Sequence, residues 1–283
     1  MRLSRRTACP FCNNNQFKIL YKKEYNSFDL KKFLNDYYKN PKIHEILISE
    51  FYEIVECNKC KGLYQNTIPD EELSLFIYEE LISSQQSFEK KVLYPIQPKE
   101  YIFDAKIIEK LVRKKNNEIN ILEFGAGWGF WARFMKSKNF NIETVEISNS
   151  RSKYLEETKV HNYMSLKTID KKYDLIFSNQ VLEHIPFPLE TIKELKTKLL
   201  NGGIMYHKFP SSFLFKKKLS KKYIPQKDCA HPLEHINIFN KNCFNEMCKI
   251  LGLKQINVNN LSLIDNLRLF KKNFLFNQII LKK

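Results

Sequence analysis

Long apolar segments are absent from this sequence. None of its 283 residues lies in an uninterrupted hydrophobic run that approaches the roughly 20 residues needed to cross a bilayer. The basic N-terminus runs directly into Cys9, with no apolar core and no small-residue cleavage site. The 7 cysteines, an odd number, do not favour a disulfide framework. We therefore expect a cytoplasmic protein with no membrane span.

Arginine is scarce among the basic residues. The net charge of +16 has the sign expected of a nucleic-acid-binding protein, but only 7 of the 47 Lys and Arg residues are arginines. The lysines are dispersed in pairs among many Asn and Ile residues. Because phosphate and base recognition favours arginine forks, we interpret the excess charge as a solvated surface and do not expect a nucleic-acid partner.

Glycine is also rare, yet 3 of the 7 glycines fall within five positions. Gly125, Gly127 and Gly129 follow a short apolar strand predicted over 119–124. Glycines let a backbone approach a ligand closely. Glu146 stands 146 − 123 = 23 positions after Glu123, at the end of the next predicted strand, where a carboxylate can accept hydrogen bonds from two ribose hydroxyls. This pairing predicts a nucleoside cofactor.

An acidic residue distinguishes this glycine turn from the turn of a dinucleotide-binding site. Dinucleotide sites space their glycines as G-x-G-x-x-G, whereas this chain has G-x-G-x-G directly behind Glu123. A carboxylate there would repel a diphosphate but suits the sulfonium and ammonium groups of S-adenosylmethionine. At this point the chain resembles the class I S-adenosylmethionine-dependent methyltransferases.

Two further motifs extend the resemblance in family order. Residues 173–179 followed by Gln180-Val181-Leu182-Glu183-His184-Ile185 resemble the family's fourth strand and the loop beneath the cofactor, and residues 202–206 resemble its glycine turn and fifth strand. The resemblance implies a doubly wound, seven-stranded, Rossmann-like sheet that binds S-adenosylmethionine. The cofactor contacts that it implies are Glu123, Phe124, Gly125, Gly127, Glu146, Ile147, Ser165, Leu166, Asn179, Gln180 and Val181.

The acceptor side is predicted from two short segments. His184 belongs to the Leu-Glu-His string, and residues 231–237 resemble a subgroup segment whose loop roofs the acceptor site. A histidine held by a nearby carboxylate can take a proton, so His235 with Glu234 is the preferred pair and His184 the third candidate. Two structural alternatives stay open: His184 supports its loop, or the pair is a hydrogen-bonded clasp.

Two cysteine pairs lie near the N-terminus. Cys9 with Cys12 and Cys57 with Cys60 each have the C-x-x-C spacing that lets two thiolates reach one ion, and four thiolates complete a structural Zn²⁺ site. Ordinary packing and redox pairs remain alternatives. The long interval 13–56 is explained by an insertion with helical segments near 30–38 and 43–47.

The sequence around the second pair resembles a methyltransferase subgroup that begins with a zinc ribbon. The resemblance covers residues 52–69, and the chain departs from it at Lys61, where that subgroup has glycine. We therefore predict a zinc-ribbon module over 1–70, a helical linker over 71–98 and a methyltransferase domain over 99–283.

Alternating patterns predict a parallel, doubly wound sheet in the last of these regions. The apolar runs 253–260 and 274–281 are expected to form a final hairpin. The other predicted elements are strands 119–124, 142–147, 160–164, 173–178 and 203–209, and helices 129–138, 149–158, 188–200 and 240–251.

The predicted function is methyl transfer to a hydroxyl, amine or carbon of a small molecule, with a sugar nucleotide or glycan precursor as the acceptor. This acceptor rests on the resemblance, because relatives of this architecture often serve surface polysaccharide pathways and a fold alone does not determine its chemistry. Two alternatives stay open. One is an RNA methyltransferase that uses the ribbon and the basic surface, and the other is a non-catalytic module that binds the cofactor and recruits a partner.

Overall fold

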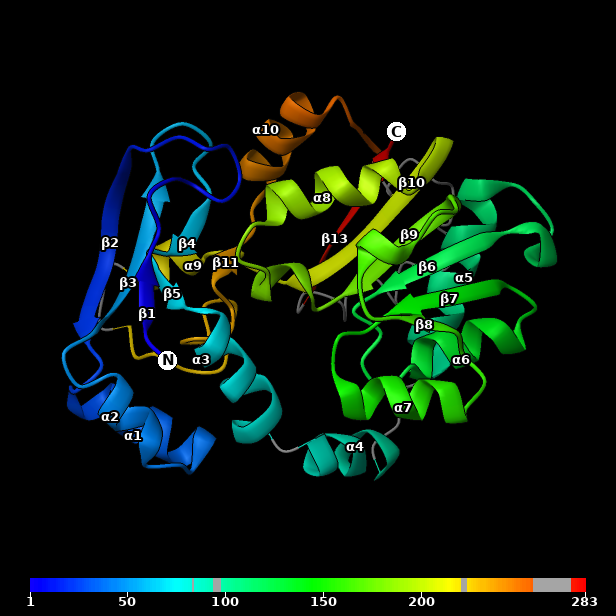
Figure 1. The fold of residues 1–283 in the computed structure, drawn as a ribbon. Helices are drawn as coiled ribbons and strands as arrows, with labels where there is room; N and C mark the ends of the chain where they lie inside the picture. The colour runs from blue at the N-terminus through cyan, green and yellow to red at the C-terminus, as the bar shows by residue number, and fades with distance from the viewer. Residues whose placement is uncertain (83, 94–97, 220–222, 257–275) are drawn as a thin grey trace.

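Two β-sheets organise the chain (Figure 1). The computed structural model describes residues 1–82, 84–93, 98–219, 223–256 and 276–283. A seven-stranded sheet carries the predicted methyltransferase motifs, and a four-stranded sheet lies beside it with the N-terminal cysteine pairs. Among the helices within these ranges, none combines the length and the hydrophobicity that a membrane span requires.

The seven-stranded sheet has the order β8-β7-β6-β9-β10-β13-β12. The strands from β6 to β10 pair in parallel, β13 runs antiparallel to β10, and β12 runs antiparallel to β13. This order confirms the predicted fold class, and its reversal beside β6 is the place where such sheets bind ligands. The strands are β6 (Asn120–Phe124), β7 (Asn141–Val145), β8 (Asn162–Tyr163), β9 (Tyr173–Asn179), β10 (Leu199–Pro210), β12 (Lys254–Ile256) and β13 (Phe276–Lys282).

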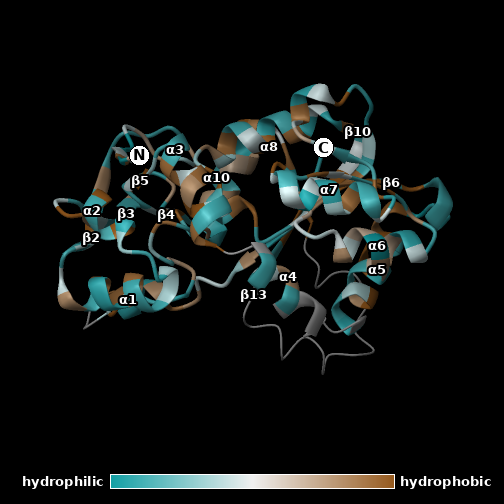
Figure 2. Cartoon of the chain, turned by 60° about the horizontal axis from the view of Figure 1, so that its bottom comes forward, coloured by the Kyte–Doolittle hydropathy of each residue, from teal (hydrophilic) through white to brown (hydrophobic). Residues whose placement is uncertain are grey.

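Helices cover both faces of this sheet, which explains its continuous apolar strands. Neighbouring residues point to opposite faces, so Ile121 packs with α5 (Pro98–Val112), α6 (Phe130–Ser137) and α7 (Asn149–Glu157), while Leu122 packs with α8 (Pro188–Thr197) and α10 (Lys241–Leu251). Figure 2 shows the helices alternating between hydrophilic and hydrophobic residues along their length, as amphipathic helices do.

Most predicted boundaries agree with the structure to within a few residues. The clearest difference is at β10, which begins at Leu199 rather than at 203. A register shift between Leu199 and Ile204, with Gly202 at a φ of 76°, lets the strand start early and shortens the preceding helix. The expected final hairpin is represented by β12 and β13, and the predicted residues between 257 and 275 lie outside the described ranges.

The smaller sheet combines N-terminal strands with one late strand. Its order is β11-β4-β3-β2, all antiparallel, and β1 (Leu3–Arg5) pairs separately with β5 (Thr67–Pro69). Two helices, α1 (Phe28–Tyr38) and α2 (Lys42–Ile46), fill the interval between the cysteine pairs, as predicted. The sheet strands are β2 (Phe17–Glu24), β3 (Phe51–Cys57), β4 (Leu63–Gln65) and β11 (Asn237–Ile238).

The segment predicted to be a helical linker also packs on the large sheet's helices. It forms α3 (Glu71–Leu75), the π-helical turn η1 (Phe76–Leu81) and α4 (Ser84–Leu93), and the side chain of Asp70 caps α3. Phe88 of α4 contacts Trp128 and Tyr154, with ring centroids 4.9 Å and 5.1 Å away. Figure 1 shows α4 beside α7, so this segment borders the predicted cofactor edge.

Candidate functional site

The glycine turn after β6 needs glycine for two reasons. Gly125, Gly127 and Gly129 have φ values of 75°, 58° and 65°, in the left-handed region that other residues rarely adopt. A Cβ added to Gly125 would lie 2.4 Å from a methyl carbon of Val181, and one added to Gly129 would lie 2.2 Å from Leu155. The turn can therefore approach the 181 loop and α7 only because these side chains are missing.

Glu146 joins the glycine turn to the next strand. It lies one residue past β7, is 3% exposed, and accepts hydrogen bonds from the amide of Gly127 at 2.7 Å and the amide of Ser148 at 2.9 Å. Burial raises the pKa of Glu146, and these amide bonds oppose the shift. A carboxylate has about four acceptor positions, and these two amides occupy two of them.

The remaining predicted cofactor contacts lie at the same edge of the sheet. Glu123 and Phe124 end β6, Asn179 ends β9, and Ser165 caps a short 3₁₀ turn that begins at Leu166 after β8. These are the carboxyl ends of neighbouring parallel strands, where open α/β sheets bind ligands. The structure therefore brings these predicted residues to the same carboxyl edge of the sheet.

Two residues of that set show unused binding capacity. Gln180 has a φ of 58°, and its buried Nε2 has no hydrogen-bond partner among the residues that the structure describes. Ile147, next to Glu146, leaves 63% of its surface exposed. A buried amide without a partner and an exposed apolar side chain beside a carboxylate fit a ligand with polar and aromatic parts.

Tyr78 is a site residue that sequence reasoning missed. Its hydroxyl donates to Glu146 at 3.4 Å, and its ring lies 4.2 Å from the guanidinium of Arg151. The indole of Trp128 also faces that guanidinium at 5.8 Å. No sequence motif marks Tyr78, since it lies in the segment predicted only as a linker.

On the acceptor side, His184 and His235 lie together with ring centroids 4.9 Å apart. His184 ends the 3₁₀ turn η4 (Leu182–His184) after β9, and His235 precedes β11. Nδ1 of His235 lies 2.5 Å from the main-chain oxygen of Asp228, which places the proton on Nδ1 and the lone pair on Nε2.

The prediction that the carboxylate of Glu234 pairs with His235 is wrong, because the two side chains have different partners. Glu234 instead accepts a hydrogen bond from the hydroxyl of Tyr38 at 2.9 Å and lies 3.5 Å from Nε2 of His231. The tight turn over 231–236 is the reason, because residues 231 and 234 come onto one side while His235 faces Asp228. His184 and His235 still lie side by side. Glu234 adjoins them through His231, whose ring centroid lies 5.5 Å from that of His235.

Burial shifts the protonation of this cluster. It raises the pKa of Glu234 to about 7 and that of Glu183, which is fully buried, to about 8. The pKa of His184 is lowered, first by its low-dielectric surroundings and then by His235. His184 nevertheless exposes part of its side chain to solvent.

The N-terminal sheet holds the segment that carries His235. Nε2 of the fully buried Gln65 donates to the main-chain oxygens of His231 at 2.8 Å and His235 at 3.0 Å. Asn237 donates to the main-chain oxygens of Leu182 at 3.0 Å and Ile185 at 2.6 Å, tying the His235 segment to the His184 turn. Sequence reasoning missed both amides, because their contacts join residues far apart in the chain.

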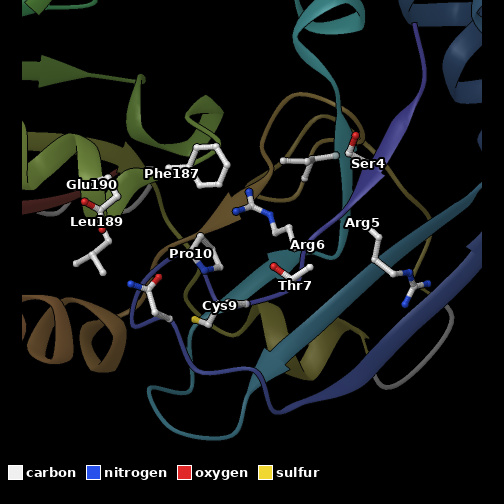
Figure 3. Close-up of a pocket in the computed structure, with 12 residues that line it drawn as sticks. Ser4, Arg5, Arg6, Thr7, Cys9, Pro10, Phe187, Leu189 and Glu190 are labelled. Atoms are coloured by element: carbon white, nitrogen blue, oxygen red, sulfur yellow. The ribbon is translucent and has the colours of Figure 1, made fainter. Parts of the chain in front are cut away.

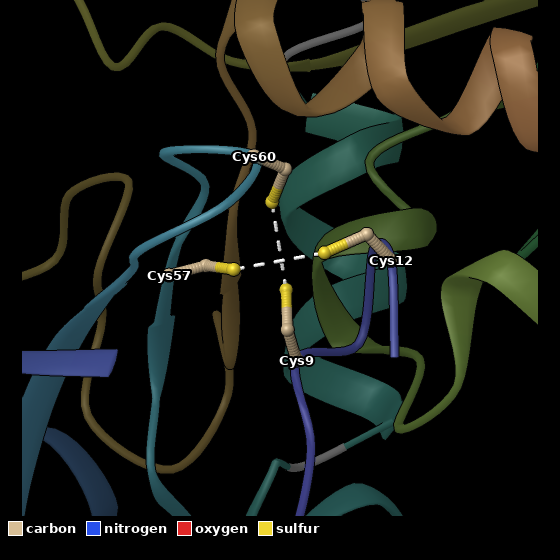
Figure 4. A group of neighbouring side chains, drawn as sticks. All are labelled: Cys9, Cys12, Cys57 and Cys60. Atoms are coloured by element: carbon tan, nitrogen blue, oxygen red, sulfur yellow. Dashed lines mark hydrogen bonds between the residues drawn. The ribbon is translucent and has the colours of Figure 1, made fainter. Parts of the chain in front are cut away.

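The four predicted zinc ligands form a single buried group, the four-cysteine cluster (Figure 4). The sulfur of Cys9 lies 3.5 Å from that of Cys60, and the sulfur of Cys12 lies 3.6 Å from that of Cys57. Zn–S bonds of about 2.3 Å in a tetrahedron place sulfurs roughly 3.8 Å apart, so the spacing fits one Zn²⁺ ion. The amide of Gly62 also donates to the sulfur of Cys60.

A separate hollow lies between the N-terminal strand and α8 (Figure 3). Its lining includes Arg6, Pro10, Phe187 and Leu189, and Cys9 is the one predicted site residue among its lining residues. Arg6 also donates from Nη2 to the side-chain oxygen of Asn237 at 3.0 Å. Its lining includes neither the glycines of the turn nor the histidines. Arg6 also donates to the main-chain oxygen of Pro186 at 2.6 Å, which ties the N-terminal strand to the loop before α8.

Comparisons with known proteins agree with this arrangement. A family described as "Methyltransferase domain" matches residues 98–258, which is 161 of 283 residues. The search of curated proteins returned no match.

Solved structures share the fold at low sequence identity. The plantazolicin methyltransferase BpumL in complex with SAH is 13% identical with a TM-score of 0.55, covering 74% of this chain and 93% of its own. The plantazolicin methyltransferase BamL is 12% identical with a TM-score of 0.52, covering 74% and 94%. Because the family match spans more than half of its length and the sheet has the expected strand order, the chain belongs to this methyltransferase family and is an S-adenosylmethionine-dependent enzyme.

Proposed function

We propose that this enzyme methylates a small molecule, with a sugar nucleotide or glycan precursor as the acceptor, and that the predicted edge residues bind the cofactor. Glu146 carries the cofactor assignment, because it is a buried carboxylate that holds the glycine turn and keeps acceptor capacity. In this assignment Glu146 receives the ribose hydroxyls. Glu123, Gly125 and Gly127 border the methionine end, and Ser165 and Leu166 border the adenine.

Methyl transfer requires positioning more than covalent chemistry. The donor carbon and the acceptor atom have to approach to about 3 Å in line, with water excluded. S-adenosylmethionine supplies the electrophilic methyl group when bound. The residues of this chain orient the acceptor and remove its proton, and the cluster of His184, Glu234 and His235 is the group of titratable side chains that we assign to that task.

We further propose that the four-cysteine cluster binds a structural Zn²⁺ ion, as in the zinc-ribbon subgroup. All four side chains are buried, and four thiolates leave no position for a substrate. The ion would fix the knuckle at Lys61, whose main-chain oxygen accepts a hydrogen bond from Asn240 at the start of α10. We keep the division into 1–70, 71–98 and 99–283, with β11 as a strand that the third region adds to the first.

Cofactor binding is tested with Glu146→Ala. Hydrogen bonds to a charged group contribute about 1.5–3 kcal/mol, so we expect affinity for S-adenosylmethionine to fall at least about tenfold in calorimetry. Glu143→Ala is the matched control, since Glu143 is on the same strand but pairs with Lys171 and Tyr173. Equal affinity in the two variants would contradict the ribose assignment.

The acceptor class is tested by turnover. Purified enzyme and S-adenosylmethionine are incubated with sugar nucleotides, structured RNA and short peptides, and S-adenosylhomocysteine release is measured. Turnover with a sugar nucleotide supports the proposal. Turnover with RNA alone, falling steeply with salt, would favour the RNA alternative, and cofactor binding without turnover on any acceptor would favour the non-catalytic module.

A further inference from the structure

We propose that Glu183, His184 and His235, here named the acid–histidine cluster, bind a divalent first-row transition-metal ion that holds the acceptor. Each residue offers one ligand atom, and the three atoms lie within 4.8 Å of one another. Bonds of about 2.0–2.2 Å bring ligands to roughly 3.0–3.5 Å spacing, which small side-chain rotations achieve. The inference rests on the proposed function and adds an ion to its acceptor side.

The carboxyl group of Glu183 is the main evidence for a cation-binding site. Its side chain is fully buried, and neither carboxylate oxygen has a hydrogen-bond partner on another described residue. An ionised carboxylate is costly in such surroundings unless it is paired or binds a metal. No cationic side chain in the described part of the chain offsets the burial of this group. The two histidines are the polar groups that share its site.

His235 has the arrangement of a metal-binding histidine. Ligating histidines donate the second ring nitrogen to a carbonyl or carboxylate, which fixes the ring and leaves the other nitrogen for the ion. Nδ1 of His235 lies on the main-chain oxygen of Asp228, and its Nε2 makes no hydrogen bond within the described ranges. Gln65 holds the main chain of His235 at 3.0 Å, so this ligand is positioned before an ion binds.

The ligand types select the ion. Two imidazoles and one carboxylate suit Zn²⁺, Mn²⁺, Fe²⁺ or Co²⁺, whereas Mg²⁺ and Ca²⁺ prefer oxygen ligands. Three protein ligands leave coordination positions open, and the exposed side of His184 leaves them accessible from solvent. An acceptor oxygen bound there would lose its proton more readily. Glu234, which is hydrogen-bonded to Tyr38 and lies beside His231, is the remaining carboxylate and would receive the proton that the acceptor loses.

The test uses full-length protein loaded with one equivalent of Zn²⁺ to fill the four-cysteine cluster. Co²⁺ is then titrated and followed by absorption and elemental analysis. We expect one further equivalent of Co²⁺ to bind without the thiolate-to-metal absorption that a cysteine site produces. In Glu183→Gln and His235→Ala we expect that affinity to fall at least about tenfold, as loss of even a ligand's supporting group costs 10–100-fold.

Matched controls separate folding from binding. His161→Ala removes an exposed histidine next to β8, outside the acid–histidine cluster, and is expected to bind Co²⁺ like the wild type. Glu183→Gln keeps the shape of the side chain and places a neutral amide where the buried carboxyl group lies, so its thermal transition should not fall. Uptake of no second equivalent by the wild type, or equal uptake by both ligand variants, overturns the inference.

Calorimetry with S-adenosylmethionine on the same samples distinguishes the two proposals. Cofactor binding and turnover without a second metal equivalent would refute the acid–histidine cluster alone. A second metal equivalent without cofactor binding would refute the proposed function and leave the metal site standing.

Discussion

The four-cysteine cluster and the acid–histidine cluster differ in how completely they surround a central ion. Four buried thiols can enclose an ion on all sides, as structural sites do, whereas one carboxylate and two imidazoles leave a side open. The two clusters are also linked, because β4 leads from the second cysteine knuckle to Gln65, which holds His235. The segment that carries the second cysteine knuckle therefore also positions the main chain of His235.

The largest expected effect comes from replacing two residues of the four-cysteine cluster. Changing Cys57 and Cys60 to Ser should abolish zinc binding and unfold the N-terminal sheet, since structural zinc contributes apparent binding free energies of about 10–16 kcal/mol in zinc-finger peptides. Elemental analysis and circular dichroism measure the two losses. Cys248→Ser changes a buried cysteine outside the cluster and should keep the metal. Retained folding in the double variant would refute the zinc proposal.

Replacing Gln65, the residue that connects the two clusters, should have the next largest effect. Gln65→Ala removes a donor from the main-chain oxygens of His231 and His235. The His231 oxygen keeps the amide of His235 at 3.0 Å, whereas the His235 oxygen loses its side-chain donor, and a buried group left unsatisfied costs about 1–3 kcal/mol. We expect a lower free energy of unfolding, at least a tenfold loss of turnover, and unchanged affinity for S-adenosylmethionine.

A second readout tests whether Gln65 positions His235 or only stabilises the fold. Affinity of the acid–histidine cluster for Co²⁺ should fall while zinc stays bound to the cysteines. Gln16→Ala, at an exposed position beside the first cysteine knuckle, is the control and should change neither affinity. A Gln65 variant that loses stability but keeps both Co²⁺ affinity and turnover would show that the link is structural only.

The gathering of the four cysteines and the glycine turn after β6 could be predicted from the sequence because their signals are local. Cysteines three residues apart and glycines two residues apart identify knuckles and turns without knowledge of the fold. Tyr78 and Gln65 could not be found in this way, since their contacts reach Glu146 and His235 across 68 and 170 positions. The partners of Glu234 and His235 were wrong for a related reason: adjacency in sequence does not show which way each side chain of a tight turn points.

The smallest expected effect lies within the closed site, at the residue where the chain departs from the zinc-ribbon subgroup. Lys61 has a φ of 56°, in the left-handed region that costs a non-glycine residue about 1–2 kcal/mol. Lys61→Gly removes this strain but adds unfolded-state entropy worth about 0.5–1 kcal/mol, so we expect a net gain below about 1 kcal/mol. The midpoint temperature of thermal denaturation should rise by about 1–3 °C, and the zinc content should stay unchanged. Lys59→Gly, in the same knuckle but outside the left-handed region, should lower stability instead, and equal shifts in both variants would show that the backbone at Lys61 is not strained.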